Sequence, residues 1–328
     1  MRISLIAAGL LTGGMATAET PVLTVMTYES FVSDWGPGPA VEAAFEETCG
    51  CDLKFVGSGD GAALLARVRL EGARSEADVV LGLDTNLMAA ARDTGLFAPH
   101  GQQVPPLDLP VAWEDDTFLP FDWGYFGFVY DTGRLPQPPA DFRALGDSDV
   151  SILIQDPRSS TPGLGLLMWV KAAYGDTAAD VWAGLADNIV TVTPGWSEAY
   201  GLFLEGEADM VLSYTTSPAY HLIAEEDPSK ATAAFAEGHY LQVEVAAKLA
   251  SSDQPELADR FLDFMLSDAF QSVIPTTNWM YPARTPKGGL PDGFETLTVP
   301  DKALLVPVNE APNLRDVALQ EWLGALSN

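Results

Sequence analysis

The sequence predicts an α/β protein built on a largely parallel sheet, and three observations lead to this class. Short apolar runs rich in β-branched residues alternate with longer segments of helical periodicity along most of the chain. Hydrophobic residues make up 47% of the sequence, which is typical of a globular chain. The 328 residues are enough for one large domain or two medium ones with a sizeable core.

The first 18 residues have the pattern of a secretory signal peptide. Arg2 precedes an apolar run over residues 3–11, and Ala16-Thr17-Ala18 offers small residues for cleavage. A buried N-terminal helix is the alternative. The run is too short to span a bilayer, and the segment lacks a cysteine for a lipid anchor. We therefore expect an exported, soluble protein whose mature chain begins near Glu19.

The formal net charge is −29, and it becomes −30 when residues 1–18 are removed, because they contain one cation and no acid. This charge excludes nucleic acid as a partner, since phosphate backbones need clustered Lys and Arg. It favours solubility and attracts cations over long distances. A plain acid-rich exported surface explains the charge equally well.

The first third of the chain predicts three strands with helices between them. Asn86 is placed to cap a helix that ends at Gly95. The predicted strands cover residues 23–28, 52–56 and 78–83, and the predicted helices begin near Pro39 and after the sequence GSGDG.

The remainder of the chain continues the alternation. Strands are predicted at 151–155, 189–193 and 209–214 in this part. Ser197 is placed to cap a helix that follows the strand at 189–193. Two longer segments, 126–131 and 239–247, are predicted as strands that connect two lobes. Helical periodicity returns in the last part of the chain, in PELADRFLDFMLS and LRDVALQEWLGAL.

Polar and aromatic residues follow the predicted strands. Because ligands of open parallel sheets bind outside the carboxyl ends of the strands, these residues are candidates for a binding site. Their mixture of rings, acids and hydroxyl groups suits a small polar ligand with a flat ring. They are Tyr28, Asp60, Gly61, Asp84, Ser160, Thr161, Trp196, Tyr214, Thr215, Thr216 and Ser217.

Two of these positions have a sharper interpretation. GSGDG lacks the G-x-G-x-x-G spacing of a dinucleotide loop, so it is either a plain turn or a place where Asp60 faces a cationic or donor-rich ligand. In DPRSSTPGLGL, Ser160 or Thr161 can cap a helix whose first turn accepts Pro162. A helix start of this kind either is an ordinary cap or binds an anion.

Catalytic and metal-binding patterns are weak. We find no G-x-S-x-G or H-E-x-x-H motif, and the three histidines are scattered. The two cysteines, Cys49 and Cys51, form either a tight local disulfide or a buried pair. The sequence therefore predicts neither a catalytic residue nor a metal site.

Eight segments together resemble the thiamine-binding periplasmic proteins of ABC importers. They occur in order over nearly the whole mature chain, and no single motif is as specific as the set. They are TYESFVSDWGPGP, DVVLGLDTN, PFDWGYFGFVYD, QDPRSSTPGLGL, VTPGWSEAYGLF, VLSYTTSPAYH, EGHYLQVEVAA and IPTTNWMYP.

The resemblance implies a type II periplasmic-binding-protein fold with the ligand cleft between two lobes. Lobe 1 would comprise residues 19–122 and 246–328, and lobe 2 residues 123–245. It also implies a periplasmic monomer without a cofactor that binds thiamine, thiamine monophosphate and thiamine diphosphate. An inner-membrane permease with a cytoplasmic ATPase would receive the ligand.

The resemblance carries over to specific residues. Ligand-binding positions of the family fall on Asp60, Gly61, Ser160, Thr161, Trp196 and residues 214–217, while Tyr28, Tyr220 and Trp279 match ring-binding aromatics. We expect Ser160 and Thr161, supported by residues 215–217, to hold a phosphate in a neutral cradle. We expect Tyr220 and Trp279 to bind the thiazolium, and Asp60 to accept hydrogen bonds from the ligand.

Two other readings stay open because a fold does not determine a function. Thiamine-degrading enzymes with a cysteine nucleophile share the two-lobed fold, and such an enzyme would need Cys49 or Cys51 as a free thiol. A binding protein for ferric ion or another small cation is the second reading. Against it, no adjacent Tyr-Tyr pair occurs in the sequence.

Overall fold

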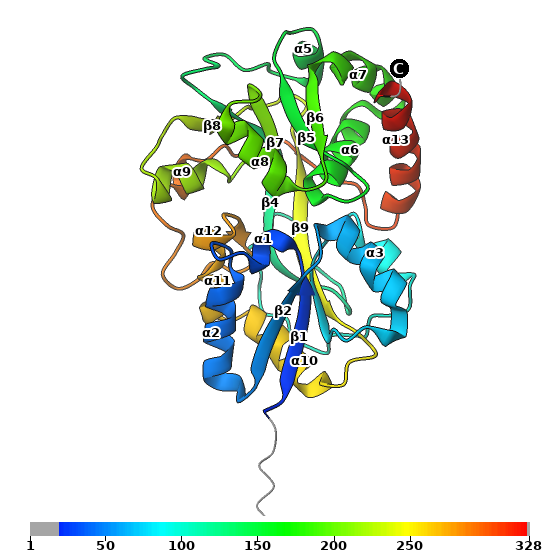
Figure 1. Cartoon of the computed structure of the whole chain (residues 1–328), viewed down its shortest axis with the longest axis vertical. Helices are drawn as coiled ribbons and strands as arrows, with labels where there is room; N and C mark the ends of the chain where they lie inside the picture. Colours follow the sequence, from blue (N-terminus) through cyan, green and yellow to red (C-terminus); the bar gives the residue numbers. More distant parts are fainter. Residues whose placement is uncertain (1–19, 327–328) are drawn as a thin grey trace, which may run out of the picture.

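The computed structural model describes residues 20–326, so the predicted signal peptide lies outside the described residues. The chain forms two α/β lobes, one above the other in Figure 1, along one mixed sheet with the order β2-β1-β3-β9-β4-β7-β5-β6. Within the described part, no helix is long and apolar enough to cross a membrane. The predicted fold class is confirmed.

The first lobe contains the parallel strands β1 (Val22–Thr27), β2 (Asp52–Gly57) and β3 (Val79–Asp84). β3 is buried along its whole length, as expected for a strand covered on both faces. The helices of this part are α1 (Glu29–Val32), α2 (Gly38–Cys49), α3 (Gly61–Glu71), α4 (Met88–Arg92), α10 (Pro255–Met265), α11 (Asp268–Gln271) and α12 (Ile274–Thr277).

Two long strands run through both lobes, β4 (Leu119–Asp131) and β9 (His239–Lys248) (Figure 1). β4 pairs with β9 up to Tyr125 and with β7 from Phe126 onward. The predicted connecting strands are therefore confirmed, although β4 begins seven residues earlier than its predicted start.

The second lobe holds the strands β5 (Ile152–Gln155), β6 (Ile189–Thr193), β7 (Met210–Tyr214) and β8 (Lys230–Thr232). Its helices are α5 (Phe142–Gly146), α6 (Thr161–Tyr174), α7 (Ala178–Leu185), α8 (Trp196–Glu205) and α9 (Pro218–Ala224). The short strands β10 (Tyr281–Pro282) and β11 (Ala303–Leu304) add to β4 and β9.

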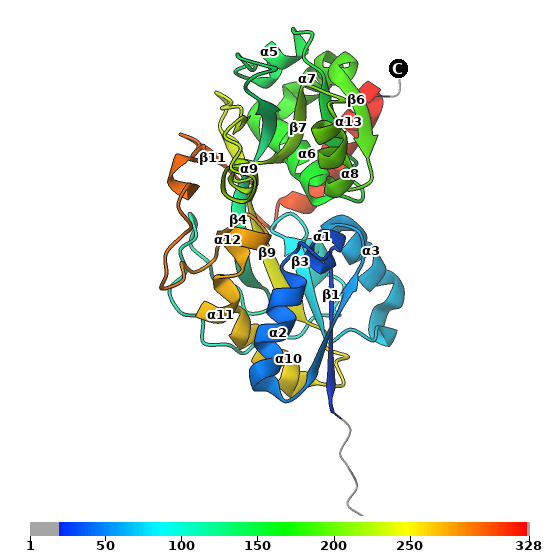
Figure 2. The ribbon, with the colours of Figure 1, turned by 60° about the vertical axis from the view of Figure 1, so that its left-hand side comes forward.

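The C-terminal helix α13 (Ala311–Leu326) packs against α6 and α7 of the second lobe, beside which both views draw it (Figures 1 and 2). The buried ammonium of Lys171 in α6 lies 2.7 Å from Oε1 of Glu321 in α13. This packing differs from the predicted assignment of residues 246–328 to lobe 1. The other predicted lobe boundaries stay predictions.

Two predicted helix caps are wrong. α4 begins only at Met88, and the Asn86 amide donates to Asp84 Oδ2, while its oxygen accepts from the Tyr240 hydroxyl. α8 begins at Trp196, so Ser197 lies inside its first turn. In both cases tertiary contacts, which a local pattern does not contain, decide where the helix starts.

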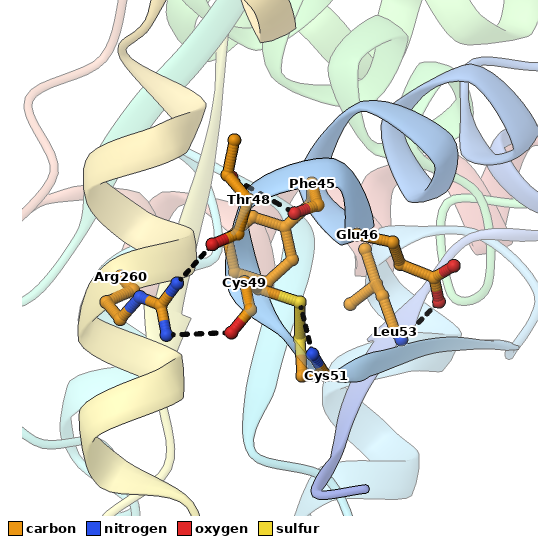
Figure 3. The surroundings of a disulfide bond; sticks show 7 residues. All are labelled: Phe45, Glu46, Thr48, Cys49, Cys51, Leu53 and Arg260. Carbon is orange, nitrogen blue, oxygen red and sulfur yellow. Dashed lines mark hydrogen bonds between the residues drawn. A yellow bond between two sulfur atoms is a disulfide. The ribbon is translucent and has the colours of Figure 1, made fainter.

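The two cysteines form a disulfide at the end of α2, shown in Figure 3. Gly50 between them has φ +64°, a conformation that suits a helix C-terminus. The guanidinium of Arg260 in α10 donates to the carbonyl oxygens of Thr48 and Cys49, which joins this helix end to α10 (Figure 3). Both thiols of the sequence are therefore used in one structural bond.

Candidate functional site

A cavity of about 480 Å³ lies between the lobes. Its wall is rich in aromatic rings, and its polar groups include two carboxyl groups but no Lys or Arg side chain. The rings are those of Tyr28, Trp35, Trp196, Tyr200, Tyr214, Tyr220 and Trp279, and the carboxyl groups are those of Asp60 and Glu244.

Most residues that the sequence proposed lie at this cavity. Gly61 and Ser160 stand directly behind the wall and are hydrogen-bonded to residues that line it. Thr215 and Thr216 are fully buried outside the lining, so their role in binding stays a prediction. The predicted residues that line the cavity are Tyr28, Asp60, Thr161, Trp196, Tyr214, Ser217, Tyr220 and Trp279.

On one side of the cavity the starts of three helices meet, and we call this the Asp60 side. Asp60, at the start of α3, accepts hydrogen bonds through Oδ2 from the Ser160 hydroxyl at 2.7 Å and from the Trp196 backbone N–H at 3.2 Å. The Gly61 N–H donates to Thr161 Oγ1 at 3.0 Å. These bonds connect the two lobes.

The group of residues at Ser160 is not neutral as expected, because it includes the Asp60 carboxyl group, and phosphate binding there stays a prediction. Ser160 does occupy the N-cap position of α6, but its hydroxyl donates to Asp60 instead of capping the helix. Burial raises the pKa of Asp60 to about 6, against the lowering effect of the hydrogen bonds from Ser160 and Trp196. The helix starts favour an anion at this place.

The close approach of the lobes on this side requires glycine at position 61. A Cβ atom there would lie 2.7 Å from Thr161 Oγ1 and 2.9 Å from the carbonyl oxygen of Gly82. Gly82 itself has φ +103°, and a Cβ there would lie 2.3 Å from the Tyr28 ring.

The aromatic wall is built from contacting rings. Trp196 stacks on Tyr200 with centroids 5.0 Å apart, and Tyr220 meets Trp279 edge to face at 5.4 Å. Trp279 has φ +56°, which is strained for a bulky residue. Strain of this kind is typical of binding sites, where the surrounding structure fixes a side chain in place.

A hydrogen-bonded chain behind the wall braces these rings. Glu225 Oε1 accepts from the Tyr220 hydroxyl, and its Oε2 lies 2.6 Å from His221 Nδ1. His221 Nε2 lies 2.9 Å from the Tyr200 hydroxyl. His221, Glu225 and Asp227 form the one acid–histidine group of the described chain that could hold a metal. Both ring nitrogens of His221 are already engaged, and none of the three residues lines the cavity.

At the opposite side of the cavity lies Glu244, and Asp84 and Asp122 flank it; the sequence analysis named Asp84 but missed Glu244 and Asp122. We call Asp84, Glu244 and Asp122 the acidic row, because they are paired across the neighbouring strands β3, β9 and β4. The Tyr28 hydroxyl lies 3.0 Å from Glu244 Oε2 and 3.1 Å from Asn278 Oδ1. The one available signal was an acid inside the apolar run HYLQVEVAA.

Burial dominates the electrostatics of this row. It raises the pKa of Asp84 to about 6 and that of Asp122 to about 8. The pKa of Glu244 is also raised, first by burial and then by the charge of Asp122. A cavity with aromatic walls and acids at both sides suits a flat neutral or cationic molecule.

Two lobes joined by crossing strands, with a ring-lined cavity between them, define a solute-binding protein of the type II periplasmic class. The sequence profile of the family described as bacterial extracellular solute-binding protein matches residues 35–272. The chain belongs to this family.

Two relatives and one solved structure show which solute-binding proteins this chain is similar to. The chain is 56% identical to a thiamine-binding periplasmic protein of Escherichia coli over 94% of each chain. It is 51% identical to a protein of the same name from Brucella melitensis, over 93% of this chain and 92% of that one. A solved structure described as a periplasmic thiamin binding protein superposes with a TM-score of 0.92 at 54% identity, covering 98% of this chain and 100% of the other.

Proposed function

We propose that this protein is the solute-binding component of an ABC importer and that it binds thiamine in the cavity between its lobes. The observation that carries the proposal is the pairing of a ring-lined wall with two carboxyl groups and no basic side chain. Thiamine combines a flat pyrimidine with a permanently cationic thiazolium, and both suit such a cavity. The names of the relatives support the same ligand.

Thiamine monophosphate and thiamine diphosphate are proposed as further ligands. Their phosphate would lie on the Asp60 side, where the N-termini of α6 and α8 favour an anion. Asp60 must then be protonated or give up its bonds to Ser160 and Trp196. Its pKa of about 6 makes the protonated form accessible at mildly acidic pH.

The proposed working cycle follows from the two-lobed fold. After cleavage of the signal peptide near Ala18, the protein would act as a monomer in the periplasm and close its lobes on the ligand. The closed form would then dock on an inner-membrane permease that has a cytoplasmic ATPase. Small-angle scattering would contradict closure if thiamine left the radius of gyration unchanged.

The structure disfavours both other readings. The disulfide between Cys49 and Cys51 consumes the thiols that a thiamine-degrading enzyme would use as its nucleophile. For a ferric-ion protein, the one candidate metal group in the described chain lies outside the cavity. We therefore propose binding without catalysis and without a cofactor.

Calorimetric titration of the mature protein tests the proposal. The protein should first be unfolded and refolded so that no carried ligand remains. One-to-one binding of thiamine is expected, and the affinity for the two phosphate esters relative to thiamine should be highest at mildly acidic pH. Absence of binding by all three compounds would refute the assignment.

A further inference from the structure

One of the two carboxyl groups at the cavity, that of Glu244, has no specific ligand contact in the function proposed above. Glu244 lies in the middle of β9 and lines the cavity, although only 5% of its surface is exposed. Its Oε2 accepts from the Tyr28 hydroxyl, and its Oε1 accepts from the Gln242 amide at 2.8 Å. It is thus held in a fixed orientation by neutral groups.

Glu244 is also the central member of the acidic row. Asp84 and Asp122 are paired with it across antiparallel strands, so the three side chains lie on the same face of the sheet. The ion pairs of the described chain all involve other acids. Arg315 acts on Asp84 through its charge without forming an ion pair.

Several acceptor atoms in this region are unused. Oδ1 of Asp84, Oδ1 of Asp122 and Oε1 of Gln242 are buried without a hydrogen-bond partner in the described part of the chain. A row of buried acids whose acceptor atoms lack hydrogen-bond partners destabilises the ligand-free protein. A cation held at the accessible member of the row would offset part of that destabilisation.

We propose that Glu244 selects a cationic ring over a neutral ring of the same shape by serving as the counter-ion of the thiazolium. This inference rests on the proposed function and adds the basis of its specificity. The rings of Tyr220 and Trp279 also accept neutral heterocycles by stacking, so they discriminate less. Asp60 is already engaged with Ser160 and the N-terminus of α8.

Binding of the cation also displaces a proton. The raised pKa values of Glu244 and Asp122 mean that this pair retains a proton at neutral pH. The other titratable groups facing Glu244 are Tyr28, Tyr214 and Asp84, and their pKa values are raised too. Because a nearby cation lowers the pKa of a carboxyl group, thiamine affinity increases as the pH rises and this pair loses its proton.

The test compares thiamine with its neutral isostere, in which a thiophene replaces the thiazolium. In Glu244→Gln, thiamine affinity is expected to fall roughly 10- to 100-fold, while the affinity for the neutral isostere changes less than about threefold. The ligand-free variant should unfold at the same or a higher temperature, because a buried acid without an ion pair has been removed.

Asp122→Asn is the matched control, since it removes a carboxyl group from the same row at a residue that does not line the cavity. It should keep thiamine affinity within about threefold while releasing fewer protons, measured by calorimetry in buffers of different ionisation enthalpy. Equal loss for both ligands in Glu244→Gln, or an unchanged preference, would overturn the inference. So would wild-type binding without proton release. Failure of the wild-type protein to bind thiamine at all would instead refute the proposed function.

Discussion

The two sides of the cavity place a carboxyl group in opposite surroundings. On the Asp60 side, the carboxylate receives a hydroxyl and a backbone N–H at the starts of two helices, and these bonds join the lobes. In the acidic row, Glu244 has two acids as neighbours and accepts only from Tyr28 and Gln242. Asp60 therefore receives hydrogen bonds at helix starts that favour its negative charge, whereas the row forms no ion pair and has only the long-range charge of Arg315 acting on Asp84.

We infer from this difference that the two sides bind different parts of the ligand. A carboxylate at helix starts can be replaced by another anion, such as a phosphate, at little electrostatic cost. A row of acids without an ion pair favours a cation. A ligand with a cationic ring and an optional phosphate satisfies both sides at once.

The largest effect is expected for the aromatic wall, which both sides share. Trp279→Ala should lower the affinity for thiamine and for its phosphates alike by roughly 10- to 100-fold, since stacking of a heterocycle on an aromatic side chain contributes about 1–3 kcal/mol. Trp279→Phe, which keeps a ring, should recover most of the loss in the same titration. An unaltered affinity in the alanine variant would remove Trp279 from the site.

Gly61→Ala should break the closed arrangement on the Asp60 side. Its Cβ would collide with Thr161 Oγ1 and with the Gly82 carbonyl, so we expect roughly fivefold to tenfold weaker binding of every ligand. Gly201 offers a matched control, because it lines the cavity but a Cβ there meets nothing within 4 Å. Equal losses in Gly61→Ala and Gly201→Ala would contradict the interpretation.

Asp60→Asn should change binding on the Asp60 side of the cavity and leave the acidic row as it is. The amide oxygen can still accept from Ser160, but the negative charge that repels phosphate is gone. The affinity for thiamine monophosphate relative to thiamine should therefore rise about threefold to fivefold at pH 7.5.

The same effect should appear in the pH dependence of the affinity for thiamine monophosphate relative to thiamine. The pKa of Asp60 is raised to about 6, so its proton is present below that pH and lost above it. In the wild-type protein the relative affinity for the monophosphate should fall as the pH rises through 6, and the fall should be smaller in Asp60→Asn. Identical pH profiles would show that Asp60 does not face the phosphate.

The brace behind the wall should have a smaller influence. Glu225→Gln weakens the bonds that orient Tyr220 and, through His221, Tyr200, so a twofold to threefold loss of thiamine affinity is expected. Glu226→Gln, an exposed neighbour, is the control and should bind as the wild type does. Matching affinities in the two variants would reduce the brace to a surface contact.

The disulfide should not affect binding at all, since neither cysteine lines the cavity. It closes a very short loop, for which the loop-closure estimate gives about 1–2 kcal/mol of stability. Reduction should lower the unfolding temperature slightly and leave thiamine affinity unchanged. A change in affinity on reduction would reveal coupling between α2 and the cavity.

The sequence predicted the fold and the Asp60 side for the same physical reason. Strand periodicity and helix starts are local patterns, and Asp60, Ser160 and Trp196 lie at the loop tips where ligands of parallel sheets bind. The sequence analysis missed Glu244 because this residue lies inside a buried strand, where no local pattern marks an acid as functional. The bond between Asp60 and Ser160 joins residues 100 positions apart, so no local pattern contains it.

A crystal structure of the complex with thiamine monophosphate would test the division of work between the two sides most directly. We predict that the thiazolium lies against Glu244 and the phosphate at the starts of α6 and α8, beside Ser160. A complex with the phosphate next to the acidic row, or with the thiazolium facing Asp60 and away from Glu244, would contradict it.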